Sequence, residues 1–427
     1  MQSTIILLTL SAAIVCWSQA SQPVVTWRSL VRQRAINQRN LLLESVRQAP
    51  AALFEPTSFA EPPKFPNTKK RLVCYYSYGQ EGLTPEGIDA NLCTHIILIG
   101  NCYPFLNGSL IEFPNATVVQ AMLAVKRRNP NLKLLLCMTA RPGGNDNGPF
   151  SDMVLDAEKM ASFARLVREF LERSGFDGFD LDWEFPVFSG RKTDFAGFPK
   201  LLKALRKEFN RTTAGRRLLI TAAVASPWTI VGQAYDVPAM NKHVDFVTIM
   251  HYDMHEYHWY TPFVGHNAPL FKKTMEVWLL GRLNTAYGTA NWYRKGMAYD
   301  KIVVGIPSYA RGFKLLSSYL SKPYAPAVGY SDFGANLDYS QVCDLLKDQG
   351  YSRVWDDTAK VPYMRKGRQW ISFEDLESAA GKADWINQMN WGGAMVFSLN
   401  CDDYRNRCSA NDTFPIVRLL KEKLLDL

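Results

Sequence analysis

Short apolar runs that alternate with amphipathic helical stretches constrain the fold of this chain more than any other feature. Eight runs have the length and composition of buried strands, and stretches between them, such as 157–173 and 195–209, repeat apolar residues every three or four positions. The runs are 72–78, 94–100, 133–138, 179–184, 218–224, 246–251, 302–307 and 394–399. Eight strands with intervening helices predict an α/β fold, a (β/α)8 TIM barrel around a parallel sheet.

The interval between the seventh and eighth runs is unusually long. It holds about 85 residues, far more than one loop and one helix need. Short aromatic-rich segments lie within it, at 361–363 and 369–371. We therefore expect a small α+β insertion domain at about 312–380, between the seventh and eighth strands of the barrel.

The first twenty residues predict export. An apolar run over 5–17 is followed by Ser18-Gln19-Ala20, a small-x-small end that suits signal peptidase, so 1–20 is interpreted as a signal peptide. Thirteen apolar residues are fewer than the ~20 that cross a bilayer, so a signal anchor is the less favoured interpretation. No later segment is long enough to span a membrane. We expect a secreted, extracellular protein.

Residues 21–69 have the composition of a basic leader and a proline-rich linker. Amphipathic spacing over 21–48 predicts a helix, and a solvated leader or propeptide is favoured over a membrane-binding helix. Five prolines between Pro50 and Pro66 make a spacer that cannot pack as a regular element. The folded domain is expected to span 70–427.

The positive charge of the chain is concentrated near this leader. The net charge of +9 comes from 49 Lys and Arg against 40 Asp and Glu, and 21–70 alone holds 8 basic and 3 acidic residues. The excess of basic over acidic residues in the rest of the chain is too dilute for a nucleic-acid-binding face, and no RNA- or DNA-binding motif occurs. We therefore expect no nucleic-acid partner. A role as an anionic-surface binder would rest on the leader alone.

Export also predicts oxidised cysteines and glycosylation. Removal of Cys16 with the signal peptide leaves seven cysteines, so at least one thiol is free or pairs outside the chain. Four Asn-x-Ser/Thr sequons are candidate N-glycosylation sites. They are Asn107, Asn115, Asn210 and Asn411.

The motif Asp177-Gly-Phe-Asp-Leu-Asp-Trp-Glu184 is the segment that carries chemistry. Because side chains alternate along a strand, Asp180, Asp182 and Glu184 share one face and the apolar residues between them share the other. The apolar face belongs against the outer helices, which sends the carboxylates into the barrel, with Glu184 at the carboxyl rim where barrel active sites lie. Close like charges raise a carboxyl pKa, so one carboxyl stays protonated and can act as a general acid.

Other interpretations of these polar residues are weaker. A calcium loop of similar spacing needs a flexible glycine turn, and a polar surface strand would not bury Phe and Trp on its other face. The motif is therefore assigned to catalysis. Four histidines that are close in sequence could suggest zinc, but they lack the His-Glu-x-x-His pattern, so we expect no metal site. They are His251, His255, His258 and His266.

The motif and its surroundings resemble glycoside hydrolase family 18, the chitinases and their chitinase-like relatives. The family signature, Asp-Gly-x-Asp-x-Asp-x-Glu on the fourth barrel strand, is present at every required position. The similarity runs from about Arg71 to Leu420, and the family also carries an α+β insertion after strand seven. Further matching segments are Cys-Tyr-Tyr at Cys74, 92–97, 250–253, 265–270, 305–311 and 392–396.

The resemblance implies an endo-acting chitinase that cleaves β-1,4-linked N-acetylglucosamine with retained configuration, using the substrate's own acetamido oxygen as nucleophile. Glu184 would protonate the leaving oxygen and later act as base toward water. Asp182 would hold the acetamido N–H, Asp180 would tune Asp182, and Tyr252 would hydrogen-bond the acetamido carbonyl. No metal or cofactor is needed. The implied substrate-binding residues are Tyr75, Met250, Asp253, Arg311 and Phe397, and Asp177 and Gly178 complete the structural motif.

The resemblance also implies two disulfides, Cys74 to Cys93 and Cys343 to Cys408. Three further cysteines lie near the ends of the second, third and eighth strands. The sequence leaves two alternatives for them, one extra disulfide or buried free thiols. They are Cys102, Cys137 and Cys401. We expect a monomer whose partner is chitin or a chito-oligosaccharide.

Several aromatic residues of the family pattern are absent. The third strand ends in Cys137-Met-Thr-Ala-Arg-Pro where the family has Ser-x-Gly-Gly and a Trp, and Phe397 replaces the Trp of strand eight. Sugar faces stack on broad aromatic planes, so weaker binding along a crystalline polymer is expected. The alternative to an enzyme is a catalytically weak or inactive chitinase-like lectin. Such relatives commonly lose the acid that corresponds to Glu184, which this chain keeps.

Overall fold

The computed structural model describes residues 65–79, 82–104, 110–140, 147–188, 190–213, 215–274, 276, 279–409 and 412–426. The expected signal peptide, most of the leader and linker, and the sequons at Asn107 and Asn411 lie outside these residues. No helix within the described ranges is long and apolar enough to cross a bilayer.

Eight parallel strands form a closed barrel, so the predicted (β/α)8 architecture is confirmed. Each predicted run contains one strand, with ends that differ by at most two residues. Around the barrel the order is β1, β16, β9, β8, β7, β6, β5, β2. The strands are β1 (Arg71–Ser77), β2 (His95–Ile99), β5 (Lys133–Thr139), β6 (Gly178–Asp182), β7 (Leu219–Ala225), β8 (Phe246–Met250), β9 (Ile302–Pro307) and β16 (Gly393–Phe397).

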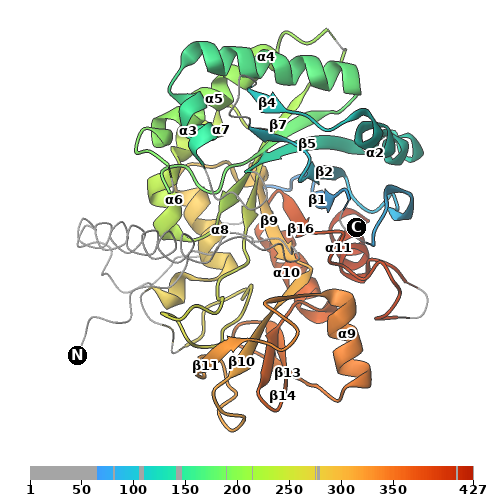
Figure 1. The fold of residues 1–427 in the computed structure, drawn as a ribbon, viewed down its shortest axis with the longest axis vertical. Helices are drawn as coiled ribbons and strands as arrows, with labels where there is room; N and C mark the ends of the chain where they lie inside the picture. Colours follow the sequence, from blue (N-terminus) through green and yellow to red (C-terminus); the bar gives the residue numbers. More distant parts are fainter. Residues whose placement is uncertain are drawn as a thin grey trace, which may run out of the picture.

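Helices surround the barrel on the outside (Figure 1). They are α2 (Ala116–Arg128), α3 (Gly148–Val154), α4 (Ala157–Ser174), α5 (Asp194–Phe209), α6 (Trp228–Ala234), α7 (Val237–Asn241), α8 (Thr285–Arg294), α10 (Leu376–Met389) and α11 (Pro415–Leu425), with short 3-10 turns at η2 (Pro85–Gly87), η3 (Leu280–Arg282) and η4 (Tyr299–Lys301). The sequence sets their ends locally. The Asp156 carboxylate accepts hydrogen bonds from two amides at the start of α4, and Gly175 ends that helix in the left-handed conformation.

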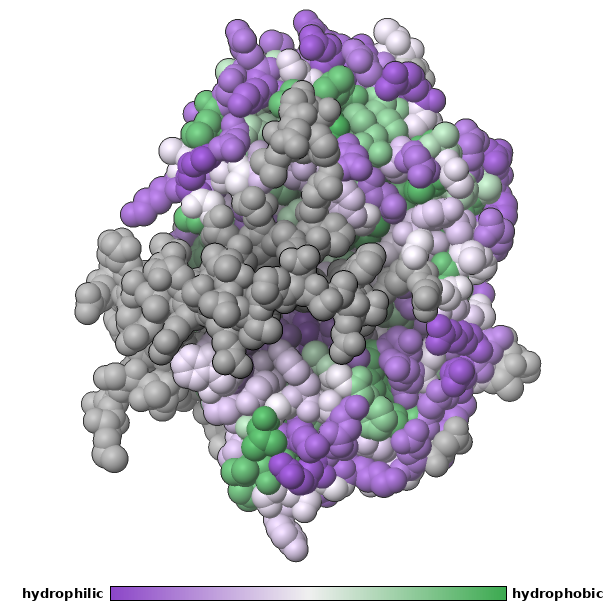
Figure 2. Space-filling view, in the orientation of Figure 1, coloured by the Kyte–Doolittle hydropathy of each residue, from purple (hydrophilic) through white to green (hydrophobic). Residues whose placement is uncertain are grey.

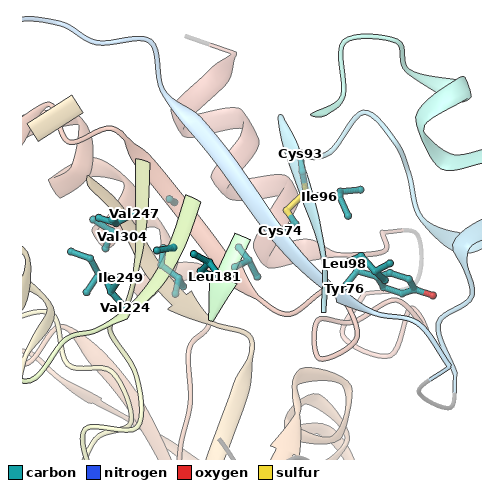
Figure 3. Close-up of a cluster of buried hydrophobic side chains, with 14 of the residues drawn as sticks. Cys74, Tyr76, Cys93, Ile96, Leu98, Leu181, Val224, Val247, Ile249 and Val304 are labelled. Carbon is teal, nitrogen blue, oxygen red and sulfur yellow. A yellow bond between two sulfur atoms is a disulfide. The ribbon is translucent and has the colours of Figure 1, made fainter. Parts of the chain in front are cut away.

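Apolar side chains fill two layers of the barrel. The outward faces of the strands and the helices share one large cluster of buried side chains. Figure 3 shows part of it, including Leu181, Val224, Val247 and Val304. A separate inner cluster includes Tyr75 from β1. This division follows from alternation along each strand, so that a residue on β6 such as Leu181 faces the helices while its neighbours face the barrel interior.

The interval between β9 and β16 folds as an antiparallel sheet with one helix. The sheet order is β11-β10-β15-β14-β13, and β12 pairs with β10. Figure 1 shows it as a separate layer beside the barrel, next to α9. Its elements are β10 (Tyr309–Leu315), β11 (Ala327–Tyr330), β12 (Asn336–Asp338), α9 (Tyr339–Asp348), β13 (Ser352–Asp356), β14 (Val361–Lys366) and β15 (Gln369–Ser372), and a two-stranded ribbon of β3 (Tyr103–Pro104) and β4 (Ile111–Glu112) lies elsewhere in the chain.

This inserted sheet carries an apolar spot on an otherwise mostly hydrophilic face (Figure 2). Exposed apolar residues of the sheet and its loops include Leu316, Leu320 and Val328. Isolated patches of this kind are common on globular proteins.

The barrel closes where its first and last strands pair, Arg71 opposite Gly393. Gly393 has φ +142°, and a Cβ there would lie 2.0 Å from the Arg71 carbonyl oxygen. A glycine is therefore required at this position.

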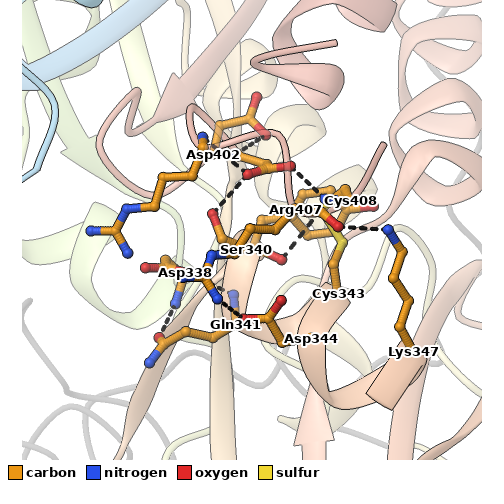
Figure 4. The surroundings of a disulfide bond; sticks show 12 residues. Asp338, Ser340, Gln341, Cys343, Asp344, Lys347, Asp402, Arg407 and Cys408 are labelled. Carbon is orange, nitrogen blue, oxygen red and sulfur yellow. Dashed lines mark hydrogen bonds and ion pairs between the residues drawn. A yellow bond between two sulfur atoms is a disulfide. The ribbon is translucent and has the colours of Figure 1, made fainter. Parts of the chain in front are cut away.

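Both disulfides that the resemblance implies are formed. Cys74–Cys93 joins β1 to the segment before β2, and Cys343–Cys408 joins α9 to the loop after β16 (Figure 4). Cys102 and Cys137 are buried free thiols. The Cys401 thiol accepts a hydrogen bond from Ser398 Oγ, at 3.5 Å.

Ordered packing reaches back into the expected linker. Phe65 stacks on Tyr299, with ring centroids 4.3 Å apart, and also contacts the rings of Tyr293 and Trp391. The Asn390 side-chain amide donates a hydrogen bond of 2.6 Å to the Phe65 carbonyl. These contacts lie beside η4 and the start of β16, at the amino ends of the barrel strands.

Candidate active site

The carboxylates of β6 face the barrel interior, as the alternation predicts. Asp180 is fully buried and Asp182 is 5 % exposed, whereas Glu184, just beyond the strand, keeps partial exposure. On the opposite face Trp183 is held between Phe150 and Phe198, with ring centroids 5.1 and 5.7 Å away. The apolar packing on one face therefore fixes the acids on the other.

Asp180 is held by hydroxyl groups from neighbouring strands. It accepts hydrogen bonds from Tyr75 Oη on β1 at 2.8 Å and from Thr221 Oγ1 on β7 at 2.5 Å. The Tyr75 hydroxyl also lies 3.1 Å from Thr248 Oγ1 on β8. Burial raises the pKa of Asp180, although the hydrogen bonds from Thr221, Cys137 and Tyr75 lower it.

Asp182 has an unused acceptor. Its Oδ1 atom is buried and has no hydrogen-bond partner among the residues that the structure describes. Burial and then the charge of Asp180 raise the pKa of Asp182 to about 7, against a hydrogen bond from Thr139. A buried carboxylate oxygen without a partner is costly in the free protein and is suited to accept a hydrogen bond from a ligand.

Glu184 is set to carry a proton at neutral pH. Burial, and then the charges of Asp182 and Asp253, raise its pKa well above the ordinary value. The Asn147 side-chain amide donates a 2.8 Å hydrogen bond to the Glu184 carbonyl, which fixes the backbone beside the carboxyl group. A protonated carboxyl at the rim of a barrel has the properties of a general acid.

The loop after β8 places Tyr252 and Asp253 next to these acids. Burial, and then the charges of Asp182, Asp253, Glu184 and Asp180, raise the pKa of Tyr252 well above normal, so its hydroxyl stays a donor. Asp253 has φ +58°, and its amide donates to Asn267 Oδ1 at 2.8 Å. Its Oδ1 accepts hydrogen bonds of 2.7 Å from Tyr309 Oη and from Arg311 Nε.

Aromatic rings line the same region. Phe397, half-buried at the end of β16, lies 5.7 Å from Tyr75, 5.8 Å from Tyr252 and 6.3 Å from Tyr309 between ring centroids. Met250, the last residue of β8, is also half-buried and packs against the inner cluster. The structure therefore brings all the expected catalytic and substrate-binding side chains together from β1, β6, β8, β10 and β16.

Asp177 and Gly178 lie at the opposite, amino end of β6. The Asp177 carboxylate accepts hydrogen bonds from Lys126 Nζ at 2.6 Å and from the Leu134 amide at 2.8 Å. A Cβ on Gly178 would lie 2.6 Å from the Leu219 carbonyl oxygen, so only glycine allows β6 and β7 to approach there. These two residues position the strand and do not line the site.

The histidines have separate partners. His251 lies between Ser226 Oγ at 2.7 Å and Thr289 Oγ1 at 2.8 Å. His255 Nδ1 lies 3.1 Å from the His266 carbonyl, and His266 Nε2 lies 2.9 Å from an Asp356 oxygen. Within the described ranges, no three His, Cys, Asp or Glu side chains form a group that could hold a metal ion.

The two described sequons are accessible. Asn115 and Asn210 are both exposed. Asn115 is the N-cap of α2, where its side-chain oxygen accepts a hydrogen bond from the Val118 amide at 3.1 Å. Its side-chain nitrogen, the atom that a glycan would modify, is not used in that bond.

Several residues of the site were not predicted. Thr221 and Tyr309 donate to Asp180 and Asp253, and Thr248 contacts the Tyr75 hydroxyl. Glu256 contacts Arg311. None of these four residues was singled out from the sequence. A signal existed for the threonines, since each is a polar residue within an apolar barrel strand. Glu256 had no such signal, because its partner is distant in sequence.

We predict that Asp182→Asn stabilises the fold at high pH. A carboxyl whose pKa is raised on folding contributes stability only while it is protonated, so stability is lost as the pH rises from the ordinary pKa to about 7. Asparagine never ionises, so the gain in unfolding free energy should be about 2 kcal/mol near pH 8 and close to zero near pH 4. Urea unfolding at the two pH values measures this. Asp332→Asn, at an exposed aspartate of the inserted sheet, is the control and should show no such difference; an equal gain at both pH values would contradict the prediction.

Comparisons with known proteins agree on one family. The family model of Glycosyl hydrolases family 18 matches residues 71–402. Chitotriosidase-1 of Mus musculus is 34% identical over 370 residues, which cover 83% of this chain and 78% of that protein. The crystal structure of TsES1, an immunomodulatory active chitinase from Trichuris suis, has a TM-score of 0.76 and 31% identity, covering 83% of this chain and 100% of that one. Human YKL-39, described as a pseudo-chitinase with retained chitooligosaccharide binding, has a TM-score of 0.74 and 28% identity, covering 83% and 99%.

Proposed function

Because this chain belongs to glycosyl hydrolase family 18, we propose that it is a secreted chitinase that cleaves β-1,4-linked N-acetylglucosamine oligomers or polymers with retained configuration. The observation that carries the proposal is the pair formed by Glu184, whose pKa is raised well above normal, and Asp182, which has a buried oxygen without a partner. We propose that residues 70–427 form the catalytic unit and act as a monomer. The two disulfides support an extracellular location.

Glu184 acts first as the acid. Its carboxyl proton moves to the glycosidic oxygen while the sugar's acetamido oxygen attacks the anomeric carbon. The bond between the anomeric carbon and the glycosidic oxygen breaks, and the leaving sugar departs with a new hydroxyl group. No side chain of the protein forms a covalent bond to the sugar. The resulting ring is an oxazolinium ion. Glu184 is then a carboxylate, and it removes a proton from the water that opens the ring.

Asp182 and Tyr252 orient the acetamido group. The free Oδ1 of Asp182 accepts the acetamido N–H, which increases the electron density on the attacking oxygen and stabilises the positive charge of the intermediate. The Tyr252 hydroxyl, kept protonated by its acidic surroundings, donates to the acetamido oxygen. Asp180, which accepts hydrogen bonds from three donors, tunes Asp182 through its charge, which raises the pKa of Asp182.

The proposal is tested with purified protein on a series of soluble N-acetylglucosamine oligomers. NMR identifies which anomer of the product forms first. Cleavage that gives the β-anomer first would support the retaining enzyme. A lectin is the second candidate, favoured by the Phe397 platform in place of a broader indole and by the likeness to a pseudo-chitinase. Oligomer binding without cleavage at any length would establish the lectin and overturn the enzyme.

A further inference from the structure

One arginine lies between two carboxylates at the side of the proposed site. Arg311 is 4 % exposed, and its Nη2 lies 2.5 Å from Asp253 Oδ1 while its Nη1 lies 3.1 Å from Glu256 Oε1. Asp253 and Glu256 both belong to the loop after β8, and Arg311 comes from β10 of the inserted sheet. The Glu256 side chain keeps 14% of its surface exposed.

This cluster has one negative charge in excess. A single guanidinium balances only one of the two carboxylates. His258 also adjoins the cluster, with its Nε2 3.8 Å from Glu256 Oε2. Burial lowers the pKa of His258, so the imidazole is neutral near neutral pH and does not supply the missing charge.

The cluster is continuous with the reacting groups. The charge of Asp253 acts on both Glu184 and Tyr252, so Asp253 adjoins the proposed acid. On the other side, burial and then the charge of Glu256 raise the pKa of Tyr260 and of Tyr330, which is 43% exposed. Glu256 therefore lies near two aromatic rings, and Tyr330, which is exposed, can stack against a further sugar.

The reacting centre next to this cluster has a buried acceptor without a partner. Asp182 Oδ1, nine-tenths buried beside Glu184 and Tyr252, has no partner among the described residues. The acetamido group of the reacting sugar satisfies that oxygen under the proposed function. Asp253, which follows Tyr252 directly in the chain, connects this centre through Arg311 to Glu256.

We propose that Glu256 binds the ammonium group of a glucosamine unit, so that the preferred substrates are partly deacetylated chitooligosaccharides with N-acetylglucosamine at the reacting position. This proposal rests on the proposed function, because only an acetylated sugar can supply the attacking oxygen. An ammonium ion next to Glu256 balances the excess negative charge and donates a hydrogen bond to its partly exposed carboxylate. A fully acetylated neighbour offers no such charge.

The test compares the fully acetylated tetramer with tetramers that carry one glucosamine at a defined position, at mildly acidic pH where the amine is protonated. The ratio of kcat/KM values is measured for the wild type and for Glu256→Gln, which keeps an oxygen for Arg311 and loses the charge. We expect the wild type to favour one glucosamine tetramer by about fivefold, the upper range for a partly exposed ion pair. Glu256→Gln should reduce that ratio to about one, and added salt should reduce it in the wild type.

Two further variants separate charge from structure. Glu256→Asp keeps the charge and should keep the preference, and Asp332→Asn removes a charge elsewhere on the inserted sheet and should leave the ratio unchanged. An unchanged ratio in Glu256→Gln, or equal losses on both substrates, overturns the proposal. If no tetramer is cleaved, the proposed function fails, and the affinities of Glu184→Gln with and without Glu256→Gln for the same tetramers decide the inference separately.

Discussion

Replacement of Glu184 by glutamine should lower kcat for oligomer cleavage by about 10²- to 10⁴-fold, the range for loss of a positioned general acid. Glutamine has nearly the same shape, but it has no proton of suitable acidity for the leaving oxygen and cannot act as a base toward water. The raised pKa of Glu184 is what makes the wild-type group effective, since it keeps the proton at neutral pH. Single-turnover assays on a soluble oligomer measure the loss.

Binding should be retained in this variant. Asp182 Oδ1, Tyr252 and the aromatic rings remain, so the Kd for a non-cleaved oligomer, measured by calorimetry, should change by no more than about threefold. Glu422→Gln, at an exposed glutamate on α11, is the matched control and should keep full activity. Retention of a tenth or more of wild-type kcat in Glu184→Gln would identify a different proton donor.

Replacement of Lys382 by methionine should destabilise the fold by about 3–5 kcal/mol, the cost of leaving one member of a buried ion pair alone. Lys382 is fully buried, pairs with Glu374 and donates a 2.6 Å hydrogen bond to the Ala268 carbonyl. Without it, Glu374 has no cation, and its second oxygen already has no hydrogen-bond partner among the described residues. Urea unfolding near neutral pH measures the change.

The pH dependence and the double variant test the cause. Burial raises the pKa of Glu374, so lowering the pH protonates this carboxyl and should reduce the penalty of Lys382→Met. Lys382→Met combined with Glu374→Leu removes both charges and should recover most of the stability. If the free energy of unfolding of the double variant falls by the sum of the decreases in the two single variants, the pair does not act as a unit.

The strands could be predicted because barrel strands bury both faces and form apolar runs that local composition reveals. The same reasoning placed Asp180, Asp182 and Glu184 on one face, since alternation is a property of the backbone and needs no partner. The two disulfides came only from the resemblance, because spacing along the chain does not fix which cysteines meet.

Contacts between distant segments could not be predicted. Glu256 meets Arg311 because the inserted sheet returns to the end of β8, and no periodic pattern encodes that approach. The histidines show that residues close in sequence need not share a site. His251 and His266 are close in sequence, but they bind different elements because the chain turns between them.

Closure of the barrel by β1 and β16 has a consequence for biosynthesis. The pairing of Arg71 with Gly393, and the contact of Tyr75 with Phe397, join the two ends of the folded domain. Such non-local contacts form slowly and form last, because a chain leaves the ribosome amino end first. A nascent chain that has already made the acids of β6 therefore has no complete sugar site. A nonsense mutation before β16 should yield an open, aggregation-prone sheet that quality control removes, and not a shortened protein with reduced activity.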